Sequence, residues 1–385
     1  MKDDLYEYTI KEFKQEVESI YKSIKHPSYP QNDTLCKAVR GKECFEEVRI
    51  STGEKILLPV SYPNFFLFRG QNKEYSPCLP SLYRQDMDKV SLFIEKMRFY
   101  TFKQLLDTHP IVDGFFKARG YKIDYEGLAQ HYGLKTHVLD FTSDIDIALF
   151  FATCHYNPKT DTYECINDKK IHKAILYLIN PLFDSMVSAE DIADFLEKHI
   201  SCIGLQPFSR PGVQKGFAYH CTDKHKGLKA TMYSIQYTAN DSRKYFAKYK
   251  SGQKIWIKDE LVPKAKAIRD LSQFTQAVFI ECYNDSALSM TASELEFELK
   301  QRGIFVRERD PKIHFSPIEL LDISQRWDEN ISEQFISSIV HRNLNINHNK
   351  YNSFSNQEIL NMLTYDIIGS DFRFPHGGII KDYNP

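Results

Sequence analysis

The sequence predicts an α+β fold, in which a mixed, mainly antiparallel sheet forms the core, helices pack against it, and helical segments flank it at both ends. Three observations lead to this fold class. Short apolar runs of strand length recur along the middle of the chain, amphipathic helical patterns lie between them, and capping-box patterns follow after residue 286. We therefore divide the chain into an N-terminal helix and loop (1–54), a central domain (55–285) and a helical C-terminal segment (286–385).

The composition is that of an ordinary globular protein. Of the 385 residues, 42% are hydrophobic and 26% are charged, so the chain has room for one large domain with additions or for two domains. The formal net charge is -1, and no overall electrostatic attraction to nucleic acid or to anionic lipid is expected. The composition therefore carries no strong nucleic-acid signal.

The N-terminus and the cysteines indicate a cytoplasmic protein without a membrane partner. The first residues, MKDDLYEYTIKEF, contain acidic side chains and no apolar signal region, and no apolar run approaches the length of a membrane span. The 8 cysteines are scattered without a CxxC pair, which is typical of reduced thiols rather than of a disulfide framework.

The first third of the chain predicts two helices separated by extended chain. Apolar residues recur at helical spacing from Tyr6 to Ile24, and the helix is expected to end before Pro27. Residues 55–68 predict extended chain that ends in an apolar run. A second amphipathic helix is expected over residues 91–106.

Strand and helix patterns continue towards the C-terminus. Further strands are expected over residues 174–179, 231–237, 254–257 and 277–282, and a helix over 188–200 with Ser188 as its cap. Capping-box spacing marks three helix starts in the C-terminal segment, at Thr291 with Glu294, Ser316 with Glu319, and Ser355 with Glu358.

The stretch from Tyr125 to Tyr156 is the strongest candidate for a functional site. Its first part, residues 125–144, places two histidines, three acidic residues and a Thr-Ser pair before an almost wholly apolar helix, whose N-cap is expected at Thr142 or Ser143. A polar segment attached to a buried element is typical of a site held on a rigid scaffold.

Three arginines occupy positions suited to anion binding. Arg69 follows directly after an apolar run, so its charge needs an anionic partner, either a carboxylate or a bound phosphate. Arg84 and Arg210 each lie in a turn-rich block. Together the three guanidinium groups would bind a phosphorylated small molecule or an acidic protein partner even without any chemistry.

Three blocks of the sequence resemble the signature blocks of the FRG domain, a bacterial family. The blocks are FRGQNKEYSPCLPSLYR, QHYGLKTHVLDFTSDIDIALFFA and SRPGVQKGF, and they occur in the family's order between about Phe66 and Phe217. The chain departs from the family pattern at His137, where an arginine is usual. The resemblance is compatible with a role in phage defence or stress response.

The first two blocks are also similar to the first two motifs of mono-ADP-ribosyltransferases, because an Arg-Gly pair ends a strand and Thr-Ser later precedes Ala-x-x-Phe. This resemblance implies NAD as the cofactor, with Arg69 on its phosphates and ribose and the pair Thr142–Ser143 bracing the pocket. It also implies a third-motif glutamate. Gln214 cannot supply the carboxylate, so Glu281 is the candidate, since a carboxylate on a buried strand is costly without a function or a partner.

These observations define a set of candidate site residues around an NAD-like nucleotide, and no metal is predicted. The reaction implied is ADP-ribosyl transfer or NAD glycohydrolysis, and Tyr132 and Tyr83 would stack on a nicotinamide or adenine ring. The expected catalytic residues are Arg69, His131 and Glu281. The expected cofactor-binding residues are Arg69, Gln71, Arg84, Gln130, His131, Tyr132, Asp140, Thr142, Ser143, Arg210 and Gln214.

Two other functions stay open. One is a non-catalytic module that senses an anion or a nucleotide, or docks an acidic protein. The other is an acid–base or metal-dependent hydrolase built on His131, His137, Asp140 and Asp144. Histidine carries protons near neutral pH, and histidine and carboxylate groups also bind Zn or Mn.

Overall fold

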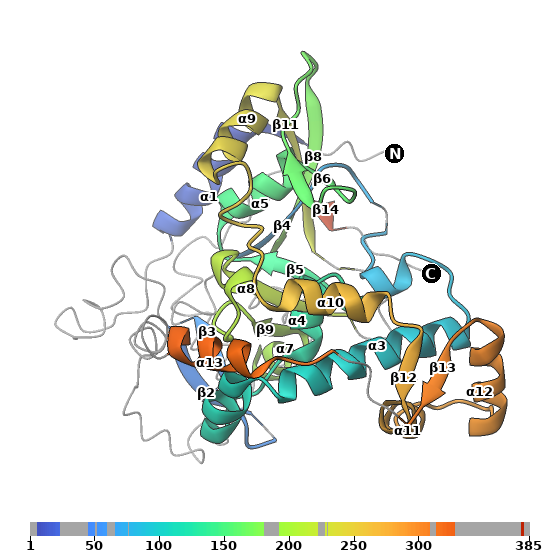
Figure 1. Ribbon diagram of the computed structural model, residues 1–385. Coiled ribbons are helices and arrows are strands. Elements are labelled where there is room, and N and C mark those ends of the chain that lie inside the picture. The colour runs from blue at the N-terminus through green and yellow to red at the C-terminus, as the bar shows by residue number, and fades with distance from the viewer. Residues whose placement is uncertain are drawn as a thin grey trace.

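The computed structural model describes residues 6–23, 45–50, 52–59, 66–75, 77–180, 192–221, 228, 230–308, 313–327 and 379–380. Within these ranges an eight-stranded sheet is packed between helices on its two faces (Figure 1). The predicted α+β architecture is therefore confirmed.

The main sheet is mixed and mainly antiparallel, as predicted. Its central order is β1-β11-β8-β4-β5-β10-β9, and β14 pairs with β11. Only the pairing of β1 with β11 is parallel among the described strands of this sheet. The strands are β1 (Glu7–Thr9), β4 (Leu67–Gln71), β5 (Val138–Thr142), β8 (His172–Ile179), β9 (Ile200–Cys202), β10 (Gly216–His220), β11 (Thr231–Tyr237) and β14 (Ile379–Ile380).

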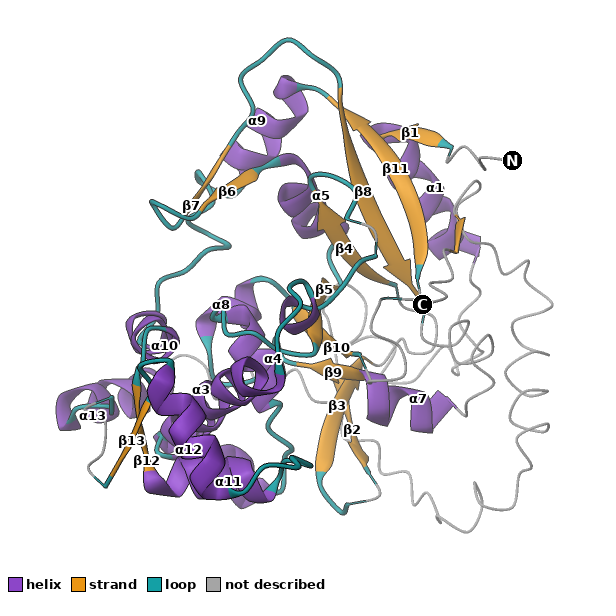
Figure 2. Cartoon of the chain, turned by 90° about the vertical axis from the view of Figure 1, so that its right-hand side faces the viewer, coloured by secondary structure: helices purple, strands orange, loops and turns teal. Residues whose placement is uncertain are grey.

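The two central strands, β4 and β5, part almost as soon as they meet. They share one residue pair, Phe68 with Thr142, whereas β4 pairs with β8 over Leu67–Gln71 and β5 pairs with β10 over its full length. Figure 2 shows β11, β8 and β4 on one side of this junction and β5, β10 and β9 on the other. The split leaves space between two strands in the middle of the sheet.

One face of the sheet is covered by three helices, α1 (Ile10–Ser23), α5 (Ile145–Thr153) and α9 (Ala239–Lys248). Alternate residues of β8 face this layer, because side chains along a strand point to opposite faces. Helix α5 crosses β4 so closely that a Cβ on Gly70 would lie 1.9 Å from the carbonyl oxygen of Ala148. A glycine is therefore needed where the helix meets the strand.

The other face is covered by a larger group of helices centred on α3 (Lys89–Asp107) and α4 (Tyr125–His131). The far side of α3 packs against α11 (Gln276–Asn284) and α12 (Ala292–Gln301) and the small sheet of β12 (Gln273–Thr275) and β13 (Phe305–Arg307). Helix α3 thus joins the central core to the C-terminal layer.

Shorter elements complete the described chain. They are β2 (Phe45–Arg49), β3 (Lys55–Pro59), η1 (Ser81–Tyr83), η2 (Val112–Phe116), η3 (Lys117–Arg119), β6 (His155–Asn157), β7 (Thr162–Glu164), α7 (Ile192–His199), α8 (Ser209–Val213), α10 (Leu261–Arg269) and α13 (Pro317–Arg326). None of the described helices is long and apolar enough to cross a membrane. The six cysteines within the described ranges are free thiols.

Most of the predicted elements are present. Strands β8 and β11, helix α3 and the capping boxes at Thr291 and Ser316 are confirmed. The N-terminal helix begins at Ile10, after the short strand β1. The caps expected at Ser188 and Ser355 lie outside the described residues.

Two predicted strands and one predicted cap are wrong. Residues 277–282 belong to α11, which Thr275 caps by accepting a hydrogen bond from the amide of Val278. Residues 254–257 lie in turns, after Lys250, Ser251 and a glycine have taken positive φ angles that reverse the chain. The cap of α5 is Asp144, whose side chain accepts from the amide of Asp146, rather than Thr142 or Ser143.

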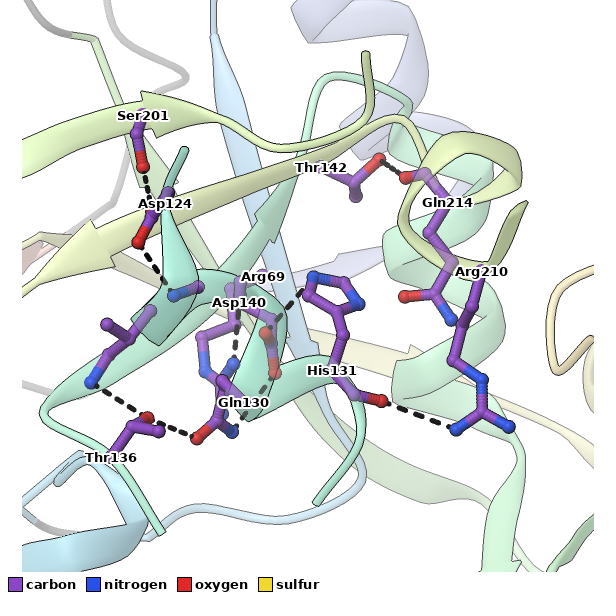
Figure 3. Close-up of polar contacts among 12 residues, drawn as sticks. Arg69, Asp124, Gln130, His131, Thr136, Asp140, Thr142, Ser201, Arg210 and Gln214 are labelled. Carbon is purple, nitrogen blue, oxygen red and sulfur yellow. Dashed lines mark hydrogen bonds and ion pairs between the residues drawn. The ribbon is translucent and has the colours of Figure 1, made fainter. Parts of the chain in front are cut away.

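Helix α4 is attached to the sheet by buried charges. Nε2 of His220 on β10 lies 2.9 Å from Oδ2 of Asp124, the cap of α4, and 3.2 Å from the hydroxyl of Ser201 on β9. The Ser201 hydroxyl also donates to Asp124 (Figure 3), and Nδ1 of His220 lies 3.8 Å from Glu126. Burial alone lowers the pKa of His220, but the two carboxylates raise it to about 10. The imidazolium therefore fixes this helix against β10.

We predict that Gly70→Ala lowers the free energy of unfolding by at least about 2 kcal/mol, because the methyl group would force α5 away from β4. Urea unfolding followed by circular dichroism measures this. The matched control is Gly114→Ala on the exposed turn η2, where an added Cβ meets nothing within 4 Å. Equal unfolding midpoints for the two variants would contradict the close packing.

We also predict that stability falls as the pH rises from 6.5 towards 10. The pKa of His220 is raised above its value of 6.5 in the unfolded chain, so its stabilising effect is complete below pH 6.5 and is lost as the imidazolium deprotonates. The difference in unfolding free energy between wild type and His220→Gln should shrink by about 2–4 kcal/mol over this range. His172→Gln is the control. If the unfolding free energy of His220→Gln changed with pH in parallel with that of the wild type, the assignment of the pH dependence to His220 would be refuted.

Candidate functional site

A cavity of about 970 Å³ opens where β4 and β5 part. Its polar side contains most of the residues that the sequence singled out, brought together from five separate segments. These are Arg69, Gln71, Arg84, Gln130, His131, Asp140, Thr142 and Gln214. The convergence gives a single place in which these side chains can act on one molecule.

Arg69 bridges the split between the two strands. Its Nη1 donates to the backbone carbonyl oxygen of Asp140 on β5 at 2.8 Å, while its buried Nε has no hydrogen-bond partner among the described residues. No described carboxylate lies within 4.0 Å of the Arg69 guanidinium. The anionic partner that the sequence requires for Arg69 is thus not a carboxylate of this part of the chain.

Arg84 lies at the rim of the same cavity and is exposed. Its Nε donates to the carbonyl oxygen of Leu79 at 3.0 Å, directly after η1. Partial loss of hydration and the nearby positive charge of Arg69 lower the pKa of Arg84. Two guanidinium groups that disfavour each other in this way are stabilised when an anion sits between them.

Asp140 is held by the end of helix α4 (Figure 3). Its Oδ2 accepts from Nε2 of Gln130 at 3.2 Å, and its Oδ1 lies 3.2 Å from Nε2 of His131 without hydrogen-bond geometry. Gln130 is oriented in turn by Ser81 and Thr136, whose hydroxyls donate to its Oε1 at 3.0 and 2.7 Å. The carboxylate is therefore fixed in place.

The setting of His131 lowers its pKa and favours the neutral imidazole. It is buried, and burial lowers its pKa despite the nearby carboxylate of Asp140, while the charge of Arg210 lowers it further. A neutral imidazole can accept a proton and return it from the imidazolium, which keeps acid–base chemistry open at this position.

Thr142 and Gln214 join the second sequence block to the third. The Thr142 hydroxyl donates to the carbonyl oxygen of Gln214 at 2.7 Å and accepts from the amide of Asp144 at 3.1 Å. The Gln214 side chain donates to the carbonyl oxygen of Ile255 at 3.0 Å. These bonds close the far end of the cavity.

Four polar atoms of cavity residues are buried and have no hydrogen-bond partner in the described part of the protein. They are Nε of Arg69, Oε1 of Gln71, Nε2 of His131 and Oδ1 of Asp140. Leaving such atoms unpaired costs about 1–3 kcal/mol each, so a ligand or water that paired with them would be favoured here.

The family comparison agrees with the blocks that carry this site. The family model of the FRG domain matches residues 64–161. The chain contains an FRG domain. The match runs from the segment before β4 to the turn between β6 and β7, and it includes Arg69, Asp140 and Thr142, whereas Gln214 lies beyond it. No curated protein and no solved structure matches the chain.

Four of the expected catalytic and cofactor-binding residues do not line the cavity of the FRG domain, and Tyr83, which was expected to stack on a ring of the ligand, does not line it either. Tyr132 is buried and donates its hydroxyl to Asp259, and Arg210 is buried with its Nε donating to the carbonyl oxygen of Ile257. Ser143 does not line the cavity, and its amide donates to the carbonyl oxygen of Lys215. The fourth is Glu281.

Glu281 lies on helix α11, outside the FRG domain, instead of on a strand. It is partly exposed, accepts from the side-chain amide of Gln104 at 3.2 Å and lies 3.6 Å from the ammonium of Lys103. The assignment of a catalytic role to Glu281 rested on a buried strand that does not exist. Glu281 also does not line the cavity.

The four residues of the hydrolase alternative do not converge. His131 and Asp140 are neighbours, but His137 pairs with Glu126 at 2.7 Å, and Asp144 caps α5. In the part of the chain that the structure describes, no three histidine, cysteine or acidic side chains are arranged to hold a metal ion.

The aromatic side of the cavity was not predicted from the sequence. Tyr156, Tyr163 and Trp256, which we call the aromatic wall, line it together with Phe151 and Tyr75. Tyr156 and Tyr163 flank the short turn between β6 and β7 at the end of the FRG domain, and Trp256 lies in a distant turn. The one signal in the sequence was the rarity of tryptophan, with 2 in the chain.

Proposed function

We propose that the cavity of the FRG domain binds an NAD-type nucleotide and supports cleavage of its nicotinamide–ribose bond. The observation that carries the proposal is the meeting of two arginines, one fixed carboxylate and an aromatic wall around one cavity. A dinucleotide combines phosphates, ribose hydroxyls and aromatic bases, so it offers a partner to each of these groups.

The phosphates of such a nucleotide would lie between Arg69 and Arg84. A guanidinium group binds phosphate oxygens through parallel hydrogen bonds, and Arg69 still has its Nε without a partner among the described residues. Each charge-assisted hydrogen bond is worth about 1.5–3 kcal/mol. The two arginines together would supply most of the affinity.

Asp140 is the carboxylate suited to the role that Glu281 cannot fill. Its Oδ1 can accept a hydrogen bond from a ribose hydroxyl, and its charge would stabilise the positive charge that develops on C1′ as the bond to nicotinamide breaks. In hydrolysis, nicotinamide leaves with the bonding electron pair, a water oxygen bonds to C1′, and the water releases one proton. ADP-ribose and neutral nicotinamide are the products.

A non-catalytic nucleotide sensor is the second candidate. It is favoured because three residues on the polar side of the cavity already form hydrogen bonds within the protein. They are Gln130, Thr142 and Gln214. Such a frame suits binding without turnover. The two candidates differ in one measurable property, the release of nicotinamide.

For binding, we predict that Arg84→Ala and Arg69→Ala each weaken the binding of NAD and ADP-ribose by roughly 10- to 150-fold, as measured by calorimetry. Arg84 is exposed at the rim, so its removal leaves the fold intact, whereas Arg69 also bridges the strands. Arg302→Ala, which removes an exposed pair with Asp88, is the control. Unchanged affinity of Arg84→Ala for NAD and ADP-ribose would contradict the assignment of Arg84 to the phosphates.

For catalysis, we predict that the wild type releases nicotinamide from NAD. Asp140→Asn should release it at least about 100-fold more slowly, while its affinity for NAD changes little. The amide keeps an acceptor for Gln130, so the variant isolates the negative charge. Glu281→Gln should behave like the wild type. Tight binding of NAD with no release in the wild type would leave the sensor as the function of this cavity.

A further inference from the structure

We infer that the aromatic wall of Tyr156, Tyr163 and Trp256 is the platform on which the flat base of the ligand stacks. This inference rests on the proposed nucleotide cavity and adds the part of the ligand that the arginines cannot recognise. All three rings line the cavity. They form its aromatic side, whereas Arg69 and Arg84 belong to its polar side.

The three rings pack on one another as a rigid unit. The ring centroids of Tyr156 and Tyr163 lie 5.4 Å apart, those of Tyr163 and Trp256 5.4 Å, and those of Tyr156 and Trp256 5.5 Å. Tilted contacts at these distances are favourable for aromatic pairs. They also leave no room for a ligand between the rings, so a base can approach only the surface that they present together.

Asp161 locks this arrangement. It lies in the turn between β6 and β7, and its Oδ1 accepts hydrogen bonds from the hydroxyl of Tyr156 and from Nε1 of Trp256, each at 2.9 Å. One carboxylate oxygen therefore joins the turn to the distant segment around Trp256. A platform that is ordered before binding saves the entropy of ordering it on binding.

The backs of two rings are already covered by the protein. The guanidinium carbon of Arg210 lies 4.2 Å from the ring centroid of Trp256, and Arg210 does not line the cavity, so it occupies the far side of the indole. Phe150 packs against Tyr163 with centroids 5.1 Å apart. Tyr156, by contrast, keeps 43% of its surface exposed. The uncovered surface of the wall is thus the side that faces the cavity and its mouth.

A flat aromatic ring is the chemistry that fits this surface. Stacking accepts any nucleobase, because every base has a π-face, and contributes about 1–3 kcal/mol per base. The cavity therefore takes a phosphate-bearing nucleotide with its base on the aromatic wall, in preference to a sugar phosphate or inorganic phosphate.

The test compares three probes, AMP, ribose 5-phosphate and inorganic pyrophosphate, by calorimetry on the full chain. We expect AMP to bind roughly 5- to 150-fold more tightly than ribose 5-phosphate, and Tyr156→Leu and Trp256→Leu to remove that difference without weakening pyrophosphate binding. Tyr156→Phe, which keeps the ring, should retain most of it. Tyr6→Leu, at an exposed tyrosine away from the cavity, is the matched control.

Tryptophan fluorescence gives an independent measurement. AMP should quench the emission of the wild type and leave that of Trp256→Leu unchanged, because the other tryptophan, Trp327, is buried against Phe115 and Phe116. Equal affinities for AMP and ribose 5-phosphate, with pyrophosphate bound, would overturn the stacking platform and leave the phosphate site standing. Failure of all three probes to bind would overturn the proposed function and the platform together.

Discussion

The hydrogen bond from Arg69 to the carbonyl oxygen of Asp140 is the contact on which the cavity depends. Strands β4 and β5 share a single residue pair, so the sheet would leave backbone groups unpaired at its centre if nothing crossed the gap. Buried backbone groups without partners are costly, and the guanidinium supplies the donor that a continuing strand would have supplied. The same side chain therefore holds the sheet together and borders the space that the split creates.

The pair Arg69–Gly70 shows how two neighbouring residues serve opposite faces of one strand. Alternation along β4 turns Gly70 towards α5, where a side chain would collide with Ala148, and turns Arg69 towards the cavity and Asp140. Neither position tolerates the other residue, since arginine cannot fit under the helix and glycine cannot bridge the strands. Gly70 and Ala148 also line the cavity, so the close packing of α5 on β4 forms part of the cavity wall and fixes its position.

The sequence was sufficient to find residues whose type conflicts with their surroundings. Arg69, Asp140 and Thr142 stand out because each ends or interrupts an apolar run, and such groups need partners wherever the chain places them. Gln214 was found only because its block resembles the third block of the FRG family. Trp256 and Tyr156 fit their local sequence without conflict, so only the three-dimensional packing reveals that they meet. The mistake over Glu281 has a similar cause, because a short apolar run suits a strand or a buried helix equally well and the cap at Thr275 decided between them.

Arg69 can take on a ligand without giving up the bond that closes the sheet. A guanidinium group has five N–H donors, and the strand bridge uses Nη1, while Nε is buried and without a partner in the described part of the chain. The planar fork presents its donors in fixed directions, so one side can serve the backbone while another faces a phosphate. A lysine at this position could not serve the backbone carbonyl and a phosphate in the same way, because its three donors lie on one atom at the end of a flexible side chain. Arg69 lies in the middle of β4 rather than at the strand end that the sequence predicted. The requirement for arginine at this position follows from its two tasks, one towards the neighbouring strand and one towards the cavity.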